Sequence, residues 1–191
     1  TFNASNNNHT LTLNATGGTK NFDPGTGTTF RGLTINANAT YKVLNDFAIT
    51  NVNFSLQNGY FDLSGRTMTV NSNNLQIVIT GGTFDVDSGT IMFTGANQVL
   101  LNNGGTLRIV GTPSRSALIT KSGGTYTISQ TAGTIHARYY RIDQTSGNGL
   151  TISGTSVIDA VNNFSDGSFT AGAGTAYLTL TGYNFSDFTA S

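Results

Sequence analysis

The sequence predicts an all-β protein folded as a right-handed parallel β-helix, a β-solenoid of about seven to eight coils. A glycine followed by an apolar–polar–apolar triplet and a turn recurs in three segments, which begin Gly59-Tyr-Phe-Asp-Leu, Gly82-Thr-Phe-Asp-Val and Gly105-Thr-Leu-Arg-Ile. The leading glycines are 23 residues apart both times, and a second alternating strand follows Phe61 and Phe84 at the same offset of seven residues. A fixed period of short strands without a helical period is typical of stacked coils.

Further copies of this pattern begin at Gly32, Gly124, Gly149 and Gly167. Residues i and i+2 of a strand share a face, so the two apolar residues of each triplet should point into one core. The expected inward pairs are Leu33/Ile35, Phe61/Leu63, Phe84/Val86, Leu107/Ile109, Tyr126/Ile128, Leu150/Ile152 and Phe169/Ala171. We expect their first members from Phe61 onward to form a single buried column.

The repeat runs through most of the chain without a linker, so we expect one domain over residues 1–191. Residues 1–31 are an irregular start that caps the stack, residues 32–180 form the coils, and residues 181–191 are a C-terminal tail. Pro24 and Pro113 fall in expected corners. An antiparallel β-sandwich is the alternative fold, because it also contains many short strands, although it does not require the fixed offset.

Composition argues against several function classes. Charged residues make up 9 % of the chain and the net charge is zero. The chain therefore lacks the basic surface expected of a nucleic-acid-binding protein. No polybasic cluster or long apolar run is present, so we expect no membrane insertion. Cysteine is absent, which excludes disulfides and thiolate metal sites and is compatible with an exported protein.

The segments Phe30-Arg-Gly-Leu-Thr-Ile-Asn, Asn58-Gly-Tyr-Phe-Asp-Leu-Ser-Gly-Arg-Thr-Met-Thr-Val and Gly81-Gly-Thr-Phe-Asp-Val resemble the degenerate repeats of large bacterial surface proteins. That group, which includes adhesin passenger domains and filamentous-haemagglutinin-like proteins, consists of right-handed parallel β-helices. The resemblance covers residues 28–180 and implies a non-enzymatic structural or adhesive part of an exported surface protein or extracellular fibre. It implies a secreted, cell-surface location and no cofactor. The partners it implies are further copies or adjacent domains, carbohydrate, or a host or neighbouring cell surface.

An outward column of side chains contains a cluster of carboxylates. Adjacent coils lie ~4.8 Å apart, so Asp62 and Asp85 should be neighbours, with Arg108 beyond Asp85 and Asp87 two residues along the chain. Two close carboxyl groups are typical of glycosidases, and these four residues are the site of our enzyme alternative, a polysaccharide lyase or glycoside hydrolase. We favour a charge ladder on a solvated face. The expected column is Thr34, Asp62, Asp85, Arg108, Thr127, Thr151 and Thr170.

The segment Arg138-Tyr-Tyr-Arg is the most charged and aromatic part of the chain. On a strand, Tyr139 and Tyr140 must face opposite ways, so one lies in the core and the other lies outside beside Arg138 or Arg141. An exposed tyrosine among polar residues can stack on a sugar ring or anchor a protein, which makes these four residues ligand-contact candidates. A core edge covered by arginine stems is the simpler interpretation.

The chain has two histidines, His9 and His136, far apart in sequence. A zinc site needs three or four ligands, so we expect no metal site. Outward threonines such as Thr67, Thr69 and Thr127 suggest ice binding as a minor alternative, by resemblance to ice-binding β-solenoids. We expect the faces to be interrupted by four residues: Asp62, Asp85, Met92 and His136.

The C-terminal strand Tyr177-Leu-Thr-Leu-Thr is apolar and alternating, with no charge before Asp187. The last strand of a solenoid offers unpaired backbone donors and acceptors that can pair with another chain. We therefore expect this coil to contact an adjacent domain or another copy of the chain. The assembly candidates are Tyr177, Leu178, Leu180 and Phe185.

Overall fold

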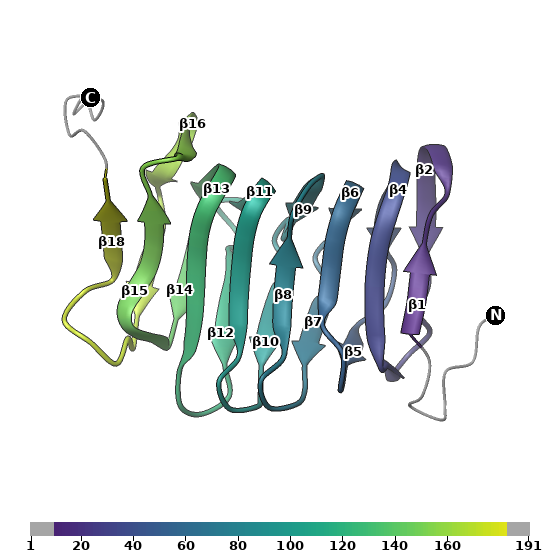
Figure 1. The fold of residues 1–191 in the computed structure, drawn as a ribbon, viewed down its shortest axis with the longest axis horizontal. Helices are drawn as coiled ribbons and strands as arrows, with labels where there is room; N and C mark the ends of the chain where they lie inside the picture. The colour runs from purple at the N-terminus through teal and green to yellow at the C-terminus, as the bar shows by residue number, and fades with distance from the viewer. Residues whose placement is uncertain (1–9, 183–191) are drawn as a thin grey trace.

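The computed structural model describes residues 10–182, which form a parallel β-solenoid of about seven turns without any helix. Figure 1 shows the coils stacked side by side in chain order along the longest axis. All pairings between the named strands are parallel, and one isolated antiparallel bridge joins Thr112 and Arg115. The predicted parallel solenoid is confirmed, and the antiparallel sandwich is wrong.

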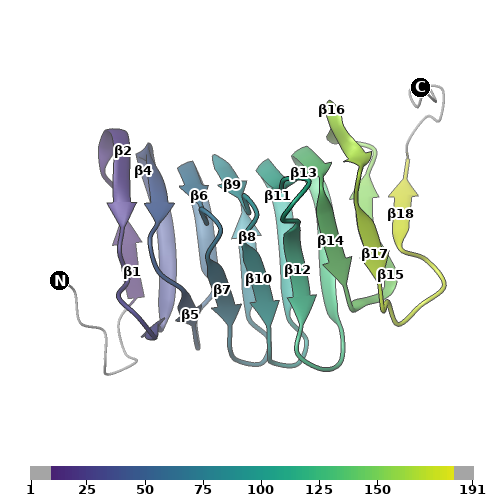
Figure 2. The same ribbon diagram turned by 180° about the vertical axis from the view of Figure 1, so that it is seen from behind.

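The strands form two sheets. The larger sheet contains β1 (Thr10–Leu13), β2 (Thr16–Phe22), β4 (Gly32–Val43), β6 (Phe54–Asp62), β8 (Gln76–Ile79), β9 (Thr83–Asp85), β11 (Val99–Val110), β13 (Tyr126–Arg138), β15 (Thr145–Ser153), β16 (Ser156–Ser165) and β18 (Leu178–Thr181). The smaller sheet, seen from behind in Figure 2, contains β3 (Thr28–Phe30), β5 (Phe47–Ile49), β7 (Thr67–Val70), β10 (Thr90–Phe93), β12 (Ala117–Lys121), β14 (Tyr140–Asp143) and β17 (Ser168–Thr170).

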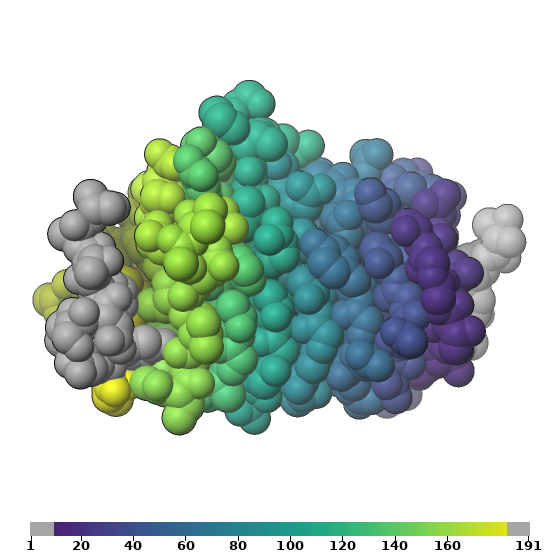
Figure 3. Space-filling view, turned by 90° about the horizontal axis from the view of Figure 1, so that it is seen from above, coloured from purple at the N-terminus to yellow at the C-terminus, as the bar shows by residue number. Residues whose placement is uncertain are grey.

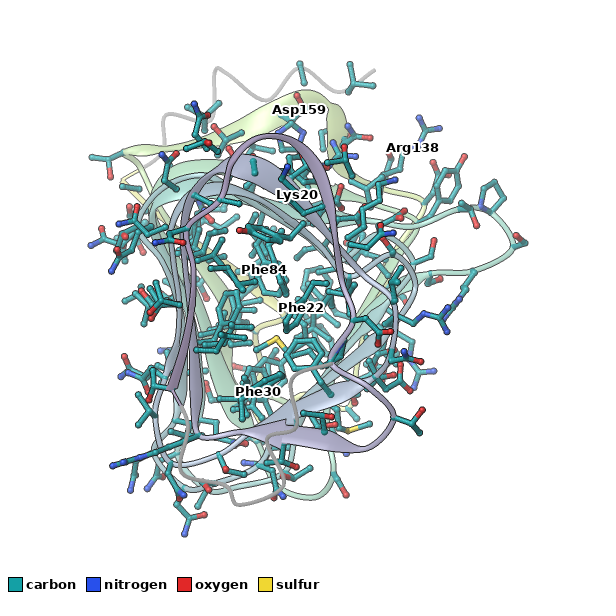
Figure 4. All side chains as sticks on the ribbon, turned by 90° about the vertical axis from the view of Figure 1, so that its right-hand side faces the viewer. Lys20, Phe22, Phe30, Phe84, Arg138 and Asp159 are labelled. Carbon is teal, nitrogen blue, oxygen red and sulfur yellow. The ribbon has the colours of Figure 1, made fainter. Side chains whose placement is uncertain are left out.

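The coils present three faces, because the longest strands bend and serve two of them. Face 1 consists of β1, β8, β18 and the first parts of β4, β6, β11, β13 and β15. Face 2 consists of β2, β9, β16 and the second parts of β4, β6, β11 and β13. Face 3 is the smaller sheet. The view along the stack shows these faces enclosing one interior filled with side chains (Figure 4).

Inward columns from all three faces fill that interior, rather than the single one expected, and faces 1 and 3 each contribute two. On face 1 one column runs Leu33, Phe54, Ile77, Leu100, Ile128, Leu150 and Leu178. On face 2 it runs Tyr41, Phe61, Phe84, Leu107, Ile135 and Ile158. On face 3 it runs Phe47, Met68, Ile91, Ile119, Ile142 and Phe169.

The single-column expectation is wrong because the same short pattern begins strands on all three faces. Leu150 lies on face 1, Phe84 on face 2 and Phe169 on face 3. Ala171, expected to point inward, is exposed. The seven-residue offset from Phe84 to Ile91 is real, and it joins face 2 to face 3 within one coil.

Glycine leads the face 2 strands because the corner before them is too tight for a side chain. Gly82 has a φ of +65°, and a Cβ there would lie 2.3 Å from the carbonyl oxygen of Gly59 one coil away. Gly133 has a φ of +80°, and a Cβ there would lie 2.1 Å from the carbonyl oxygen of Gly105. Only glycine satisfies both the left-handed conformation and the close approach of stacked backbones.

The two end coils are less buried than the middle of the stack. Strands β1 to β3 pair in register with β4 and β5, so residues 10–30 already form a coil within the segment that we expected to be an irregular cap. The alternation of buried and partly buried side chains weakens in β1, β16 and β18. Figure 3 shows the coils from above as a continuous elongated body. The described residues, 10–182, include no helical segment that could span a membrane.

Candidate functional site

A row of charged side chains, here named the charged ladder, crosses face 2. Its members stand in neighbouring coils at matching register positions, except Asp159, which reaches the row from β16. They are Lys42, Asp62, Asp85, Arg108, His136 and Asp159. The expected neighbours Asp62, Asp85 and Arg108 are therefore brought together. Thr34, Thr127 and Thr151 lie on face 1 and Thr170 lies on face 3, so the rest of the expected column is wrong.

Asp85 is the most heavily bonded member of the ladder. Its Oδ2 accepts a hydrogen bond from Arg108 Nε at 2.9 Å and another from the Tyr60 hydroxyl. Its Oδ1 accepts from the backbone N–H of Asp87 at 3.1 Å. The residue is 5 % exposed. Both oxygens are thus occupied by protein donors and shielded from solvent.

Asp62, one coil earlier, is also buried and bonded to protein donors. Its Oδ1 accepts from the backbone N–H of Ser64 at 2.6 Å, and its Oδ2 lies 3.9 Å from Lys42 Nζ. The residue is 7 % exposed, so the expectation of an open, solvated face is wrong for both aspartates. The physical reason is that the strand ends at this position. The short carboxylate folds back onto the next turn and satisfies a backbone amide there, as in an Asx turn.

Asp87 reaches solvent beside these two carboxylates but is partly covered by the surrounding strand ends. Partial burial, followed by the negative charges of Asp62 and Asp85, raises the pKa of the Asp87 carboxyl. Burial and the hydrogen bond to Asp85 also raise the pKa of Tyr60. A carboxyl with a raised pKa next to other carboxyl groups has the electrostatics of an acid–base pair. However, the second carboxylate of such a pair must reach the substrate, and Asp62 and Asp85 are both buried.

The far end of the ladder joins His136 to Asp159. Their Nδ1 and Oδ1 atoms are 3.4 Å apart, and His136 Nδ1 is buried without a hydrogen bond. A hydrogen bond from the backbone N–H of Asn162 is the main cause of the lowered pKa of Asp159. Among residues 10–182, no group of three histidine or carboxylate side chains is arranged to hold a metal ion. His9 lies outside the described residues.

The aromatic and basic segment divides between core and surface, but not by strand alternation, because Tyr139 is a corner residue with a φ of +49° between β13 and β14. Tyr140 is buried and packs edge-on against Phe164 and Phe169. Tyr139 is half-buried on the outside, with the Arg138 guanidinium 4.9 Å from its ring centroid.

Both arginines of this segment are already paired. Arg138 binds Asp166 at 2.9 Å, and Arg141 binds the buried Asp143 at 2.7 Å. A ligand at Tyr139 would therefore meet a cation that is shared with a carboxylate.

The assembly candidates lie at the last described coil. Leu178 and Leu180 continue the inward columns of face 1 and are half-buried, because they have β15 on one side only. Tyr177 is 48 % exposed. Phe185 lies outside the described residues.

Polar residues in the core columns are the feature that sequence reasoning missed. Asn102 and Gln130 occupy the column that Ile35, Leu56 and Ile79 begin. Asn102 Nδ2 donates to Gln130 Oε1 at 2.8 Å and to the Gly105 carbonyl at 3.1 Å, which ties the corner between faces 1 and 2. The sequence did contain a signal for them, because Asn102 and Gln130 are polar residues at positions where the strand alternation calls for apolar ones.

Face 1 carries no Asp, Glu, Lys or Arg on its strand positions. Its central outward column consists of Thr12, Thr34, Ser55, Val78, Leu101, Ser129, Thr151 and Thr179. The expectation that Asp62, Asp85, Met92 and His136 interrupt the threonine ranks is wrong for this face, because these residues lie on faces 2 and 3.

Comparison of the chain with protein-family models, with curated proteins and with solved structures found no match. The parallel stacking of its two sheets places the protein in the class of parallel β-solenoids.

Proposed function

We propose that this chain is a rigid, non-enzymatic segment of an exported bacterial surface protein or extracellular fibre, with an adhesive contact face. The observation that carries the proposal is the unbroken ladder of parallel strands from β1 to β18 around one apolar core. Each inner coil is held by the coils on both sides, and a stack of this kind behaves as a stiff rod. Sequence patterns that resemble bacterial surface repeats support an exported location.

The contact face in this proposal is face 1. Aliphatic side chains of Val78, Val99 and Leu101 lie at its middle, and hydroxyl residues flank them on both sides. Protein interfaces share this arrangement of an apolar centre within a polar rim, with few charges at the centre. Such a face suits a neutral partner, such as uncharged carbohydrate or a protein on a cell surface.

A polysaccharide panel tests the proposal against the enzyme alternative. The chain is incubated with each polymer, and bound protein and released reducing ends are measured in the same samples. We expect binding without cleavage. Leu101→Glu, which places a charge on face 1, should reduce binding about tenfold, whereas Thr69→Glu, on face 3, should leave it unchanged.

Release of reducing ends that disappears in Asp87→Asn would replace our proposal with the hydrolase or lyase alternative. Equal binding by wild type, Leu101→Glu and Thr69→Glu would contradict the assignment of face 1.

Ice binding is the second candidate, and the absence of charge along the whole of face 1 favours it. Thr12, Thr34 and Thr151 each present a methyl and a hydroxyl group outward, one residue per coil. Thermal hysteresis measures this activity directly. Ice binding predicts a freezing-point gap that Thr34→Lys abolishes, and the adhesive proposal predicts no gap.

A further inference from the structure

Lys121 occupies a position that belongs to the core. A second inward column on face 3 runs Phe30, Ile49, Val70, Phe93 and then Lys121. Lys121 is only 6 % exposed. A lysine in an apolar column is costly unless its ammonium group finds partners, so its presence calls for a physical explanation.

The ammonium group has partners, but none of them is charged. Nζ donates to the backbone carbonyls of Thr125, at 2.8 Å, and of Gly95. No carboxylate within residues 10–182 lies within ion-pair distance of it. An ammonium carries three N–H donors, so one remains after these two bonds. Burial lowers the pKa of Lys121, which agrees with a cation that lacks a counter-charge.

A pocket of about 310 Å³ lies beside the Lys121 side chain, between two corners of neighbouring coils. Lys121 lines it together with residues 94–97 and 123–125. Gly123 and Gly124 both have left-handed backbone conformations, with φ of +80° and +69°. Successive amides in turns of this kind form concave sites for anions.

Gly124 packs beside Lys121, and the amides of both glycines are unpaired within residues 10–182. A Cβ on Gly124 would lie 3.8 Å from Lys121 Cε, which places this glycine directly against the lysine side chain. The amides of Gly123 and Gly124 have no hydrogen-bond acceptor within the described part of the chain. Lys121, whose ammonium group has a spare donor, and Gly123 and Gly124, whose amides are unused, therefore line the same pocket.

We propose that this pocket, here named the Lys121 pocket, binds a carboxylate group, with the third N–H of Lys121 and the amides of Gly123 and Gly124 as donors. The carboxylate belongs to a small free acid or to a uronic acid unit of an acidic polysaccharide. This inference does not depend on face 1, because the Lys121 pocket lies at a different corner and takes a charged ligand.

Titration of the ¹⁵N-labelled full chain with sodium glucuronate at constant ionic strength tests the proposal. We expect saturable shifts of the Gly123 and Gly124 amide resonances, and none with glucose. Lys121→Met, which keeps an unbranched side chain in the column, should weaken binding at least about tenfold. Lys42→Met, which removes an exposed lysine, is the matched control and should bind like wild type.

Asn97→Asp provides a second variant in case Lys121→Met does not fold. It adds a negative charge at the rim of the Lys121 pocket while the neighbouring coils keep their packing, so glucuronate affinity should fall. Polygalacturonate distinguishes the two sources of the carboxylate: tighter binding per carboxylate than glucuronate indicates a polymer ligand. Shifts that are absent up to about 50 mM glucuronate, or equal in wild type and Asn97→Asp, would overturn the proposal and leave Lys121 as a brace for the corner carbonyls.

Discussion

Arg108 Nε donates a hydrogen bond to Asp85 Oδ2 at 2.9 Å, and the two residues are register partners on adjacent coils. This bond places a cation beside a buried carboxylate in the middle of the charged ladder. It also explains how face 2 carries Asp62 and Asp85 next to each other. The repulsion between them is offset by Arg108 on one side and Lys42 on the other.

We predict that Asp85→Asn lowers the free energy of unfolding by about 1–3 kcal/mol, because Arg108 and Tyr60 lose a charged acceptor in a buried place. Asp166→Asn is the matched control. It breaks the exposed pair with Arg138, and it should cost less than about 1 kcal/mol. Denaturant unfolding measured by circular dichroism compares the two. Equal costs would mean that the ladder contributes no more than a surface ion pair.

The aromatic core gives a second prediction. Phe84 is fully buried, with its ring centroid 5.2 Å from that of Phe54 and 5.7 Å from that of Phe61. Phe84→Ala should cost about 3–5 kcal/mol, since a large cavity would remain between stacked coils. Val157→Ala, at a side chain that is 58 % exposed, should change stability by less than about 0.5 kcal/mol. A small effect at Phe84 in the same unfolding assay would contradict the face 2 column.

Alkaline pH should destabilise the fold. Burial raises the pKa of Tyr140 to about 12 and also raises the pKa of Tyr60 and Tyr126. A raised pKa in the folded state means that stability is intact below about pH 10 and is lost as pH rises toward the folded value. Tyr140→Phe keeps the ring and removes one titrating group, so it should reduce this loss. Melting temperatures between pH 9 and pH 12 provide the test, and an unchanged pH profile in Tyr140→Phe would contradict the assignment.

Assembly at the C-terminal coil is the fourth prediction. Strand β18 pairs only with β15 among the described strands, so its outer edge offers backbone groups to another copy or to an adjacent domain. Light scattering should show association that rises with concentration. Leu178→Lys with Leu180→Lys should suppress it, and circular dichroism should confirm that the remaining coils stay folded. A wild-type chain that stays monomeric at high concentration would contradict this prediction.

Much of the fold was predictable because alternation and turn glycines are local signals. The repeat from Gly59 to Ile109 predicted parallel stacking, and Phe61, Phe84 and Leu107 are in fact successive neighbours. The face of each strand was not predictable in the same way. The triplets at Leu150 and Phe169 have the same pattern as the one at Phe84, since every corner needs a turn and every strand alternates.

The candidate sites were harder to predict, because burial depends on how a strand end folds back. Asp62 and Asp85 were placed side by side correctly, but their hydrogen bonds to the turn amides of Ser64 and Asp87 could not be seen in the pattern. Lys121 was overlooked because its column, through Phe93, becomes visible only when the register is known.

The register of the coils is the central claim, and cysteine pairs test it most directly, because the chain has no native cysteine. Ser129 and Thr151 are outward register partners on adjacent coils of face 1, at a spacing that a disulfide can bridge. Arg108 and Thr127, which a single-column stack would make neighbours, lie on different faces. Mass spectrometry after mild oxidation should find the disulfide in Ser129→Cys/Thr151→Cys and none in Arg108→Cys/Thr127→Cys. The opposite result would contradict the three-faced solenoid.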